Sequence, residues 1–161
     1  MTKNILTHSP YCILFLPLNR ELIMVYGKSI TISMQGFSDM RDITGEVEAI
    51  IGESGITSGI VTVFATGSTA SVSTVEYEPA LIEDVKERLE AIAPRSLRSR
   101  HSETWGDDNG FSHIRATLMG PGITVPFTKG KLELGTWQQI VVLDHDNRPR
   151  QRRVFVQVMG E

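Results

Sequence analysis

The stretch from residue 101 to residue 138 reads HSETWGDDNGFSHIRATLMGPGITVPFTKGKLELGTWQ, and it indicates the fold class of the chain. Residues 112–119 alternate between polar and apolar side chains, which predicts a strand. Gly120-Pro121-Gly122 is a strong turn signal. Two further strand-like runs follow, over residues 123–127 and 131–134. Because no helical pattern separates these runs, we expect neighbouring antiparallel strands.

The same stretch contains two histidines, His101 and His113, on either side of an acidic loop with Asp107 and Asp108. Imidazole changes its charge near neutral pH and is a common metal ligand. The spacing of the two histidines is no standard ligand signature. A histidine packed at a strand start and an exposed loop histidine are therefore the structural alternative to a shared chemical site.

Outward from this stretch, residues 42–54 and 79–93 have helical spacing. Their apolar stripes are Ile43, Val47, Ile50 and Ile51 in the first segment and Leu81, Val85, Leu89 and Ile92 in the second. Gly55 is expected to end the first helix, since glycine readily adopts the left-handed conformation found there. Pro79 suits the first position of the second helix, where no amide hydrogen is required.

Strand patterns account for most of the remaining chain. They cover residues 25–34, 59–65, 69–76, 136–143 and 152–159. Thr66-Gly67-Ser68 separates the second of these runs from the third and predicts a bend. Strands outnumber helices, so the sequence predicts a single α+β domain with a mostly antiparallel sheet or sandwich and two main helices.

Composition excludes several classes of protein. The 161 residues are 40% hydrophobic and 22% charged, with a net charge of −3, which argues against a dedicated nucleic-acid binder. The one cysteine, Cys12, excludes a disulfide framework and a cysteine-rich zinc site, as expected of a cytoplasmic protein. No run reaches the length of about 20 apolar residues that a membrane span needs.

Residues 1–23 differ from the rest of the chain. An apolar run from Ile13 to Leu18 is interrupted by Pro17 and lacks the marks of a signal peptide. The first regular strand pattern opens at Met24. We therefore interpret residues 1–23 as an N-terminal extension, residues 24–161 as the domain and Met24 as the natural start, with a terminal arm packed at an oligomer interface as the alternative.

Three segments together resemble the YjbQ family, also called secondary thiamine-phosphate synthases. They are STASVSTVEYEPALIEDV at 68–85, NGFSHIRATLMG at 109–120 and VPFTKGKLELGTWQQIVVLDHDNRPRQRRVFVQVMGE at 125–161. The resemblance covers residues 24–161. It implies a compact α+β fold, assembly as a homotrimer and a pocket lined by histidines at or near the subunit interface.

The resemblance assigns pocket residues one by one. His101 and His113 fall on two family histidines, and Glu76 falls on a family acid. The Gly-Thr-Trp-Gln motif is intact at 135–138. At the start of an apolar strand, an indole such as Trp137 either packs in the core or faces a ligand. The polar Gln138 either lines a pocket or pins a loop. The third family histidine heads a His-Thr-Thr/Ser-Ala motif, which here reads Gly67-Ser68-Thr69-Ala70, so a glycine replaces the imidazole.

That glycine leaves the metal content of the pocket open. Three imidazoles and a water can form a tetrahedral zinc site. With only His101 and His113, a divalent ion such as Zn or Mg would need Glu76, Asp107 or a donor from a neighbouring subunit. No cofactor is therefore required by the resemblance.

The alternative is a metal-free anion site. In this interpretation the two histidines and Arg115 hold a phosphate by charge-assisted hydrogen bonds. The backbone amides of Gly67, Ser68 and Thr69 add a small anion nest. The basic connector Arg95–Arg100 is either a solvated loop or a clamp for an anionic ligand.

The activity that the resemblance implies joins a pyrimidine diphosphate to a thiazole phosphate and releases pyrophosphate. His101, His113 and Glu76 would be catalytic, and Arg115, residues 67–69, Trp137 and Gln138 would bind substrate. A non-catalytic trimeric binding protein for a phosphorylated metabolite or a metal is the alternative. Both hypotheses expect the two histidine rings to share one cavity with residues 135–138 and the bend near residue 67.

Overall fold

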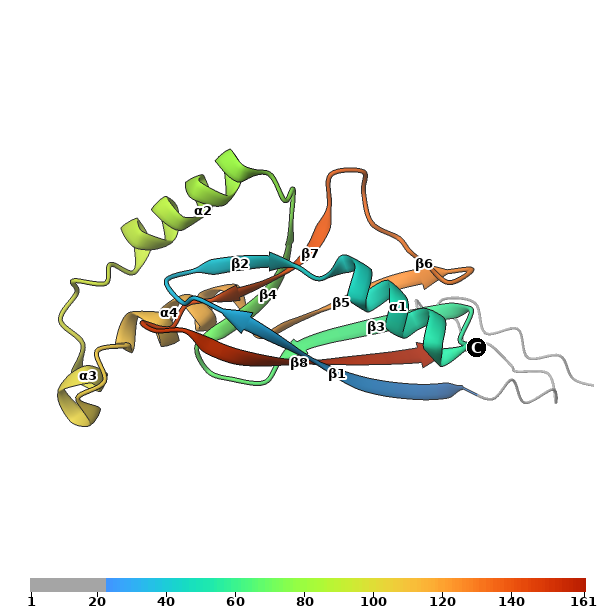
Figure 1. Cartoon of the computed structure of the whole chain (residues 1–161), viewed down its shortest axis with the longest axis horizontal. Helices are drawn as coiled ribbons and strands as arrows, with labels where there is room; N and C mark the ends of the chain where they lie inside the picture. The colour runs from blue at the N-terminus through green and yellow to red at the C-terminus, as the bar shows by residue number, and fades with distance from the viewer. Residues whose placement is uncertain (1–22) are drawn as a thin grey trace, which may run out of the picture.

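The computed structural model describes residues 23–161, so the extension expected over residues 1–23 lies outside the described residues except for its last one. The strands are β1 Met24–Met34, β2 Asp39–Asp42, β3 Ser58–Ala65, β4 Ala70–Val75, β5 Gly122–Thr128, β6 Lys131–Leu132, β7 Gln139–Asp144 and β8 Arg150–Gly160. The helices are α1 Thr44–Ser54, α2 Pro79–Ile92, α3 Arg100–Trp105 and α4 Gly110–Met119 (Figure 1).

The described strands form two antiparallel sheets. The larger has five strands in the order β1-β8-β3-β5-β6, and the smaller has three in the order β2-β7-β4. Long pairings with one-to-one register join β8 to both β1 and β3. This arrangement confirms the predicted α+β class and its antiparallel sheets.

The core lies between the two sheets and on both faces of β7. Ile140 and Val142 pack toward the five-stranded sheet together with Val61, Val63 and the apolar face of α1. The alternate residues of β7, Val141 and Leu143, pack with Leu89 of α2. Because β7 is buried on both faces, its sequence is a continuous apolar run although its neighbours are antiparallel.

The two predicted main helices are confirmed within one residue or two of their expected ends. Helix α1 buries Val47, Ile50 and Ile51, and Gly55 caps it in the left-handed conformation with φ of 69°. Helix α2 begins at Pro79. The side chain of Glu78, the residue just before it, accepts hydrogen bonds from the amides of Ala80 and Leu81. These ends follow the glycine and proline signals in the sequence.

The strand predicted over residues 112–119 is wrong, because this segment is helix α4. Its buried face consists of Phe111, Ser112, Arg115 and Ala116, whereas the apolar Ile114 is 43% exposed. The buried positions follow an i, i+4 spacing that includes two polar residues. The polar members of the buried face therefore hid the helical period and left an apparent alternation.

Smaller differences lie at element ends. Residues 136–138 form a turn ahead of β7 rather than its first part, and β6 is limited to Lys131–Leu132. Strand β2 and helix α3 carry no clear periodic pattern and were not expected. Among the described residues, no helix combines the length and the apolar character that crossing a membrane requires.

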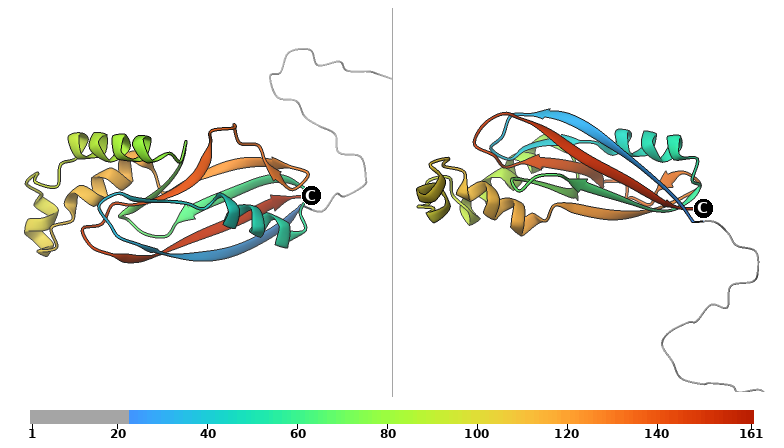
Figure 2. Two further views of the ribbon diagram at one scale, coloured as in Figure 1. Left: turned by 45° about the horizontal axis from the view of Figure 1, so that its top comes forward. Right: turned by 90° about the horizontal axis from the view of Figure 1, so that it is seen from below.

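The helices are distributed unevenly over the molecule. Figures 1 and 2 show α2, α3 and α4 gathered at one end, and α1 near the other end beside the C-terminus. The region with α3 and α4 contains both candidate histidines. The fold thus places them at the helical end of the domain.

Candidate functional site

Helices α3 and α4 bring the two predicted histidines together. The ring centroids of His101 and His113 are 4.5 Å apart, with 58° between the ring planes. Gly106 ends α3 in the left-handed conformation, and the chain then turns directly into α4. At Gly110 an added Cβ would lie 1.8 Å from the Ser99 hydroxyl, so only glycine permits this close approach of the two helices.

A carboxylate supports the histidine pair on one side. The Nε2 atom of His101 lies 3.3 Å from Oδ2 of Asp107. The amide nitrogen of Asn109, turned toward these groups, lies 3.2 Å from both Asp107 oxygens and 3.3 Å from the same Nε2 atom. Asn109 is buried, and in this orientation its side-chain nitrogen is within hydrogen-bond reach of Asp107, which lies beside the His101 ring.

A cleft of about 410 Å³ opens on the other side of the two rings. Its apolar walls include Leu97, Phe111 and Ile114, and Arg98 and Arg100 supply positive charge. The volume suits a small molecule. The cleft therefore combines proton-carrying groups, an apolar wall and cations.

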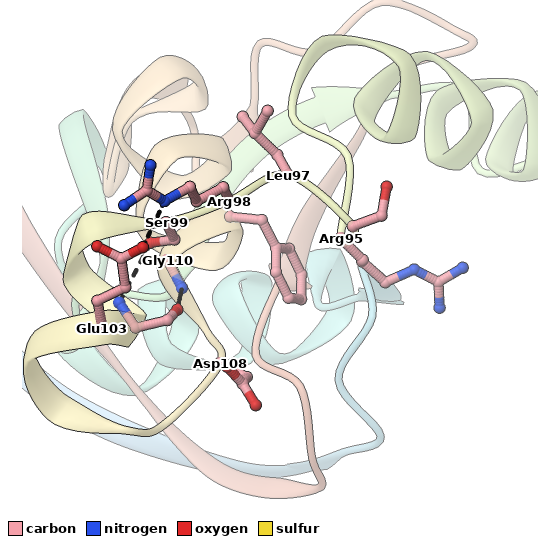
Figure 3. Close-up of a pocket in the computed structure, with 10 residues that line it drawn as sticks. Arg95, Leu97, Arg98, Ser99, Glu103, Asp108 and Gly110 are labelled. Carbon is pink, nitrogen blue, oxygen red and sulfur yellow. Dashed lines mark hydrogen bonds and ion pairs between the residues drawn. The ribbon is translucent and has the colours of Figure 1, made fainter.

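A second cleft of about 500 Å³ adjoins the first and shares the connector between α2 and α3 as its wall. Figure 3 shows Arg98 turned toward Glu103 across this cleft, while Arg95 points away from it. Arg98 donates from Nε to Glu103, and Arg95 donates from Nε to Glu90 at 3.0 Å. The basic connector expected to be either a loop or a clamp thus lines both clefts.

Arg115, expected to contact an anionic substrate, is instead buried in the interior. Its guanidinium donates to Glu90 at 2.6 Å, to the carbonyl of Ala93 at 2.8 and 3.0 Å and to the hydroxyl of Ser38 at 3.1 Å. It also lies 4.9 Å from the centre of the Phe111 ring. Since its side chain is 2% exposed, these donors serve the fold, and Arg115 is removed from the set of substrate contacts.

The most buried histidine was missed by the sequence analysis. His145 is fully buried, with Ser38 at 3.0 Å from Nδ1 and Ser71 at 2.8 Å from Nε2. Because Ser38 accepts from Arg115, its hydroxyl donates to Nδ1, and Nε2–H donates to Ser71. Burial, followed by the positive charges of Arg115 and Arg152, lowers the pKa of His145 to about 3.

The sequence feature that points to this buried polar network is the run Asp144–Asp146 at the end of β7. A charged and polar run directly follows the apolar strand, and all three of these residues are buried. Arg152 donates to both carboxylates and to the hydroxyl of Thr69. Burial raises the pKa of Asp146, but hydrogen bonds from Arg150 and the Asn147 amide outweigh it, and the net pKa is lowered.

The bend at Gly67 lies against this ionic cluster. A Cβ atom at Gly67 would lie 3.5 Å from Nη1 of Arg152, so the guanidinium is adjacent to the position of the expected third imidazole. The amide of Gly67 already donates to Ala65. The hydroxyl of Thr69 donates to Asp146. These bonds leave less of the expected anion nest available than the sequence implied.

The bend and the histidine pair are connected through the segment after β7. The side-chain nitrogen Nδ2 of Asn147 donates to the backbone carbonyl of Asp107 at 2.7 Å. Arg148 and Arg150 line a polar cleft of about 500 Å³ together with Asp107 and Asn109. The bend near residue 67 is thus on the histidine side of the molecule.

The Gly-Thr-Trp-Gln turn lies at the other end of the small sheet. Val75 of β4 is opposite Gln139, whereas Ala70 is opposite Asp144. These two ends of β4 are about 17 Å apart at the usual rise per residue. Glu76 and Trp137 share a separate cleft there. Within one chain, therefore, residues 135–138 do not join the histidine cavity, which corrects the expectation of a single shared site.

Gln138 joins this turn to strand β4 through two side-chain hydrogen bonds. Its side chain accepts from the amide of Gly135 at 3.0 Å and donates to Thr74 at 2.9 Å. Of the two expectations for Gln138, the structure supports the one in which it pins a loop. Trp137 is consequently held outward, 71% exposed, and is not a core residue of this chain.

The donor set does not fit a metal within one chain. Among residues 23–161, no group of three or more His, Cys, Asp or Glu side chains is placed to hold an ion. Gly67 stands where the resemblance predicts a third imidazole, and Glu76 lies at the distant end of β4. We therefore assign no chemical step to a metal.

Comparisons with known proteins agree with one another. A family model described as "UPF0047 protein YjbQ-like" matches residues 28–161. A UPF0047 protein of Methanothermobacter thermautotrophicus is 36% identical, over 85% of this chain and 94% of its own length. The UPF0047 protein YugU of Bacillus subtilis is 33% identical, over 83% of this chain and 98% of its own length.

Solved structures show the same likeness in three dimensions. A YbjQ-like protein of unknown function from Sulfolobus solfataricus has a TM-score of 0.82 and 34% identity, covering 87% of this chain and all of that one (100%). A YjbQ/UPF0047 protein from Clostridium acetobutylicum has a TM-score of 0.75 and 31% identity, covering 81% of this chain and 98% of that one. None of these names states a substrate.

Proposed function

We propose, from the premise that the chain belongs to the UPF0047 family of YjbQ-like proteins, that its histidine cleft binds a phosphorylated small heterocycle. The proposed reaction is of the thiamine-phosphate synthase type. The observation that carries this proposal is the convergence of His101 and His113, whose ring centroids are 4.5 Å apart beside a cleft of about 410 Å³. Two proton-carrying rings next to an apolar wall suit a reaction on an aromatic heterocycle.

The proposed chemistry forms one bond and breaks another. The ring nitrogen of the thiazole phosphate attacks the methylene carbon of the pyrimidine diphosphate, and the carbon–oxygen bond to pyrophosphate breaks. The electron pair leaves with pyrophosphate, and a protonated histidine of the pair donates a hydrogen bond or its proton to it. Asp107 holds the ring of His101 in place for this role.

Positive charge for the phosphates comes from the connector in this proposal. Arg98 and Arg100 line the cleft with the histidines, whereas Arg115 is buried and already bonded. Guanidinium groups bind phosphate oxygens in paired geometry. In this proposal, Arg98 and Arg100 of the connector bind the anion that Arg115 was expected to bind.

The test is product formation by purified protein. Wild type is incubated with hydroxymethylpyrimidine diphosphate and thiazole phosphate, and thiamine phosphate is measured. We expect His113→Gln to lower the rate by at least about tenfold, since a general acid or base contributes about 10²–10⁴-fold. Trp105→Phe, an exposed change on α3, is the matched control and should keep the wild-type rate. Equal product from wild type and His113→Gln would remove the proposed role.

A second function is favoured by one specific observation. Position 67 holds a glycine with Arg152 beside it, and Glu76, expected to be catalytic, lies away from the histidines, so the cleft of one chain has neither a third imidazole nor this carboxylate. These absences suit a binding protein for a phosphorylated metabolite. Saturable calorimetric binding of thiamine phosphate, together with no product in the activity assay, would select this function over catalysis.

Assembly as a homotrimer is part of the proposal. The outer face of the large sheet exposes an apolar stripe that one polar pair interrupts. Phe64 of β3 is opposite Phe155 of β8 and Ile60 is opposite Met159, with Thr62 and Gln157 between these pairs. Apolar stripes of this kind commonly mark contact surfaces. We propose that other copies of the chain cover this stripe. A cytoplasmic location, proposed from the single cysteine, completes the description.

A further inference from the structure

A cleft of about 440 Å³ lies at the end of the small sheet away from the histidines. It is formed by the chain that leaves β4 and by the turn that enters β7. Two aromatic residues, Tyr77 and Trp137, and three acidic ones, Asp42, Glu76 and Glu78, line it. This combination of rings and carboxylates is absent from the histidine cleft.

Hydrogen bonds hold Tyr77 and the turn that carries Trp137. The hydroxyl of Tyr77 donates to the carbonyl of Met40 at 3.1 Å, and the amide of Tyr77 donates to Gln139 at 2.9 Å. The Trp137 turn is pinned by the two hydrogen bonds of Gln138. The indole is 71% exposed, so a large ring face is presented to solvent without a protein partner over most of its area.

The three carboxylates differ in the hydrogen bonds that they already make within the protein. Glu78 caps helix α2, and the amides of Ala80 and Leu81 lower its pKa. One oxygen of Asp42 accepts from both the amide and the hydroxyl of Thr44. The backbone carbonyl of Glu76 accepts from the amide of Glu78 at 2.9 Å, but its carboxylate has no hydrogen bond or ion pair with any described residue. No lysine, arginine or histidine lines the cleft, so its negative charge is not neutralised within it.

We propose that this cleft binds an organic cation, either a quaternary ammonium group or an N-alkylated aromatic heterocycle. The face of an indole ring attracts such a cation, and nearby carboxylates add Coulomb attraction. A phosphate would be repelled by the acidic lining. A hard metal ion prefers oxygen ligands and gains nothing from the aromatic walls. The inference does not depend on the reaction proposed for the histidine cleft.

Nuclear magnetic resonance of the full chain tests this directly, because the chain has two tryptophans. Trp137 and Trp105 are 71% and 72% exposed, so Trp105 is an internal control of equal accessibility. The probe is choline, compared with its neutral carbon analogue 3,3-dimethylbutan-1-ol. We expect choline to shift the Trp137 indole N–H signal in a saturable way and to leave Trp105 unchanged. The neutral analogue should bind at least about fivefold more weakly.

Two variants separate the ring contribution from the charge contribution. Trp137→Leu keeps an apolar side chain and should weaken choline binding, followed through the backbone amide signals near Glu76, by about five- to thirtyfold. Glu76→Gln should weaken it by a few fold, with the difference shrinking at high salt. Equal affinity for the neutral analogue, equal shifts at both tryptophans, or no binding by wild type would each overturn the proposal. Trimer dissociation in Trp137→Leu without choline binding by wild type would assign the cleft to a subunit contact instead.

Discussion

At the scale of single residues, the interior of this domain contains an unusual concentration of polar groups. Arg115, Ser38 and His145 form a hydrogen-bonded series that ends at Ser71. His145 is buried, and the positive charges of Arg115 and Arg152 lie near it, so its pKa is lowered and it stays neutral in the folded state. Such a network is stable only while every member keeps its partner. We expect it to control how stability responds to acid.

The first prediction concerns the pH dependence of stability. The folded-state pKa of His145 is about 3, against 6.5 for the unfolded chain, so only the unfolded state binds this proton between these values. Stability is therefore expected to fall as pH decreases below about 6.5, with a slope that approaches about 1.4 kcal/mol per pH unit. Urea unfolding at fixed protein concentration, at pH 7 and at pH 5, measures this.

His145→Asn should remove that slope while lowering stability at pH 7. The range between pH 7 and pH 5 isolates His145. Carboxylates with lowered pKa values, such as Asp146, stay ionised there, and their contribution to the free energy of unfolding is lost only at more acidic pH. An unchanged pH slope in His145→Asn would show that another group is responsible. Circular dichroism at pH 7 confirms that the variant is folded.

The second prediction compares two arginines that share one carboxylate. Arg115 and Arg95 both bond Glu90, but their side chains are 2% and 54% exposed. Arg115→Met should lower the free energy of unfolding by about 3 kcal/mol or more, because buried partners lose their hydrogen bonds. Arg95→Met should change it by no more than about 1 kcal/mol. Similar losses in both variants would mean that the burial of Arg115 does not set the cost.

At the scale of elements, the helices and strands that could be predicted are the ones whose buried face is entirely apolar. Helices α1 and α2 and most strands belong to this group, and their glycine and proline ends were recognisable. Helix α4 does not, because Ser112 and Arg115 occupy its buried face and Ile114 is exposed. The buried arginine depends on partners from distant segments, Ser38 and Glu90, that no local pattern reveals.

The same reasoning explains what could be predicted of the site. His101 and His113 were identified as a pair, and the structure brings their rings together. The separation of Trp137 from them follows from the register of β4 against β7, which is a long-range property. His145 was missed because a single histidine after a strand has no spacing signal of its own.

The third prediction uses two glycines of α1. Gly52 lies inside the helix with open space around its Cβ position, so Gly52→Ala should raise the free energy of unfolding by about 0.5–1 kcal/mol. Gly55 also has open space, but its φ is 69°. Gly55→Ala should therefore lower stability by about 1 kcal/mol. Thermal unfolding of both variants checks this, and changes of the same sign would contradict the assigned helix end.

At the scale of the whole molecule, the histidine cleft and the cleft beside Trp137 differ in chemistry and lie at different ends of the small sheet. One combines imidazoles and arginines, and the other combines aromatic rings and carboxylates. The outer face of the large sheet, with Phe64 and Phe155, remains exposed in the single chain. A trimer built on that face would add neighbouring subunits around these clefts, and this makes the assembly state a test of the proposal.

The fourth prediction is therefore a mass measurement. Light scattering should give three times the 17.9 kDa chain mass for wild type. Phe155→Glu places a charge in the apolar stripe and should shift the mass toward that of a single chain. Arg88→Glu, an exposed change on α2, should leave it unchanged. A monomeric wild type would exclude the homotrimer, and a trimeric Phe155→Glu would place the contact elsewhere.

The central claim, that the rings at positions 101 and 113 act on one ligand, is tested most directly by a double-mutant cycle on pyrophosphate affinity. Calorimetry gives the dissociation constants of wild type, His101→Gln, His113→Gln and the double variant. Rings that contact the same anion should show a coupling free energy of about 1 kcal/mol or more. Losses that add within about 0.3 kcal/mol, or unchanged affinity in both single variants, would contradict the claim.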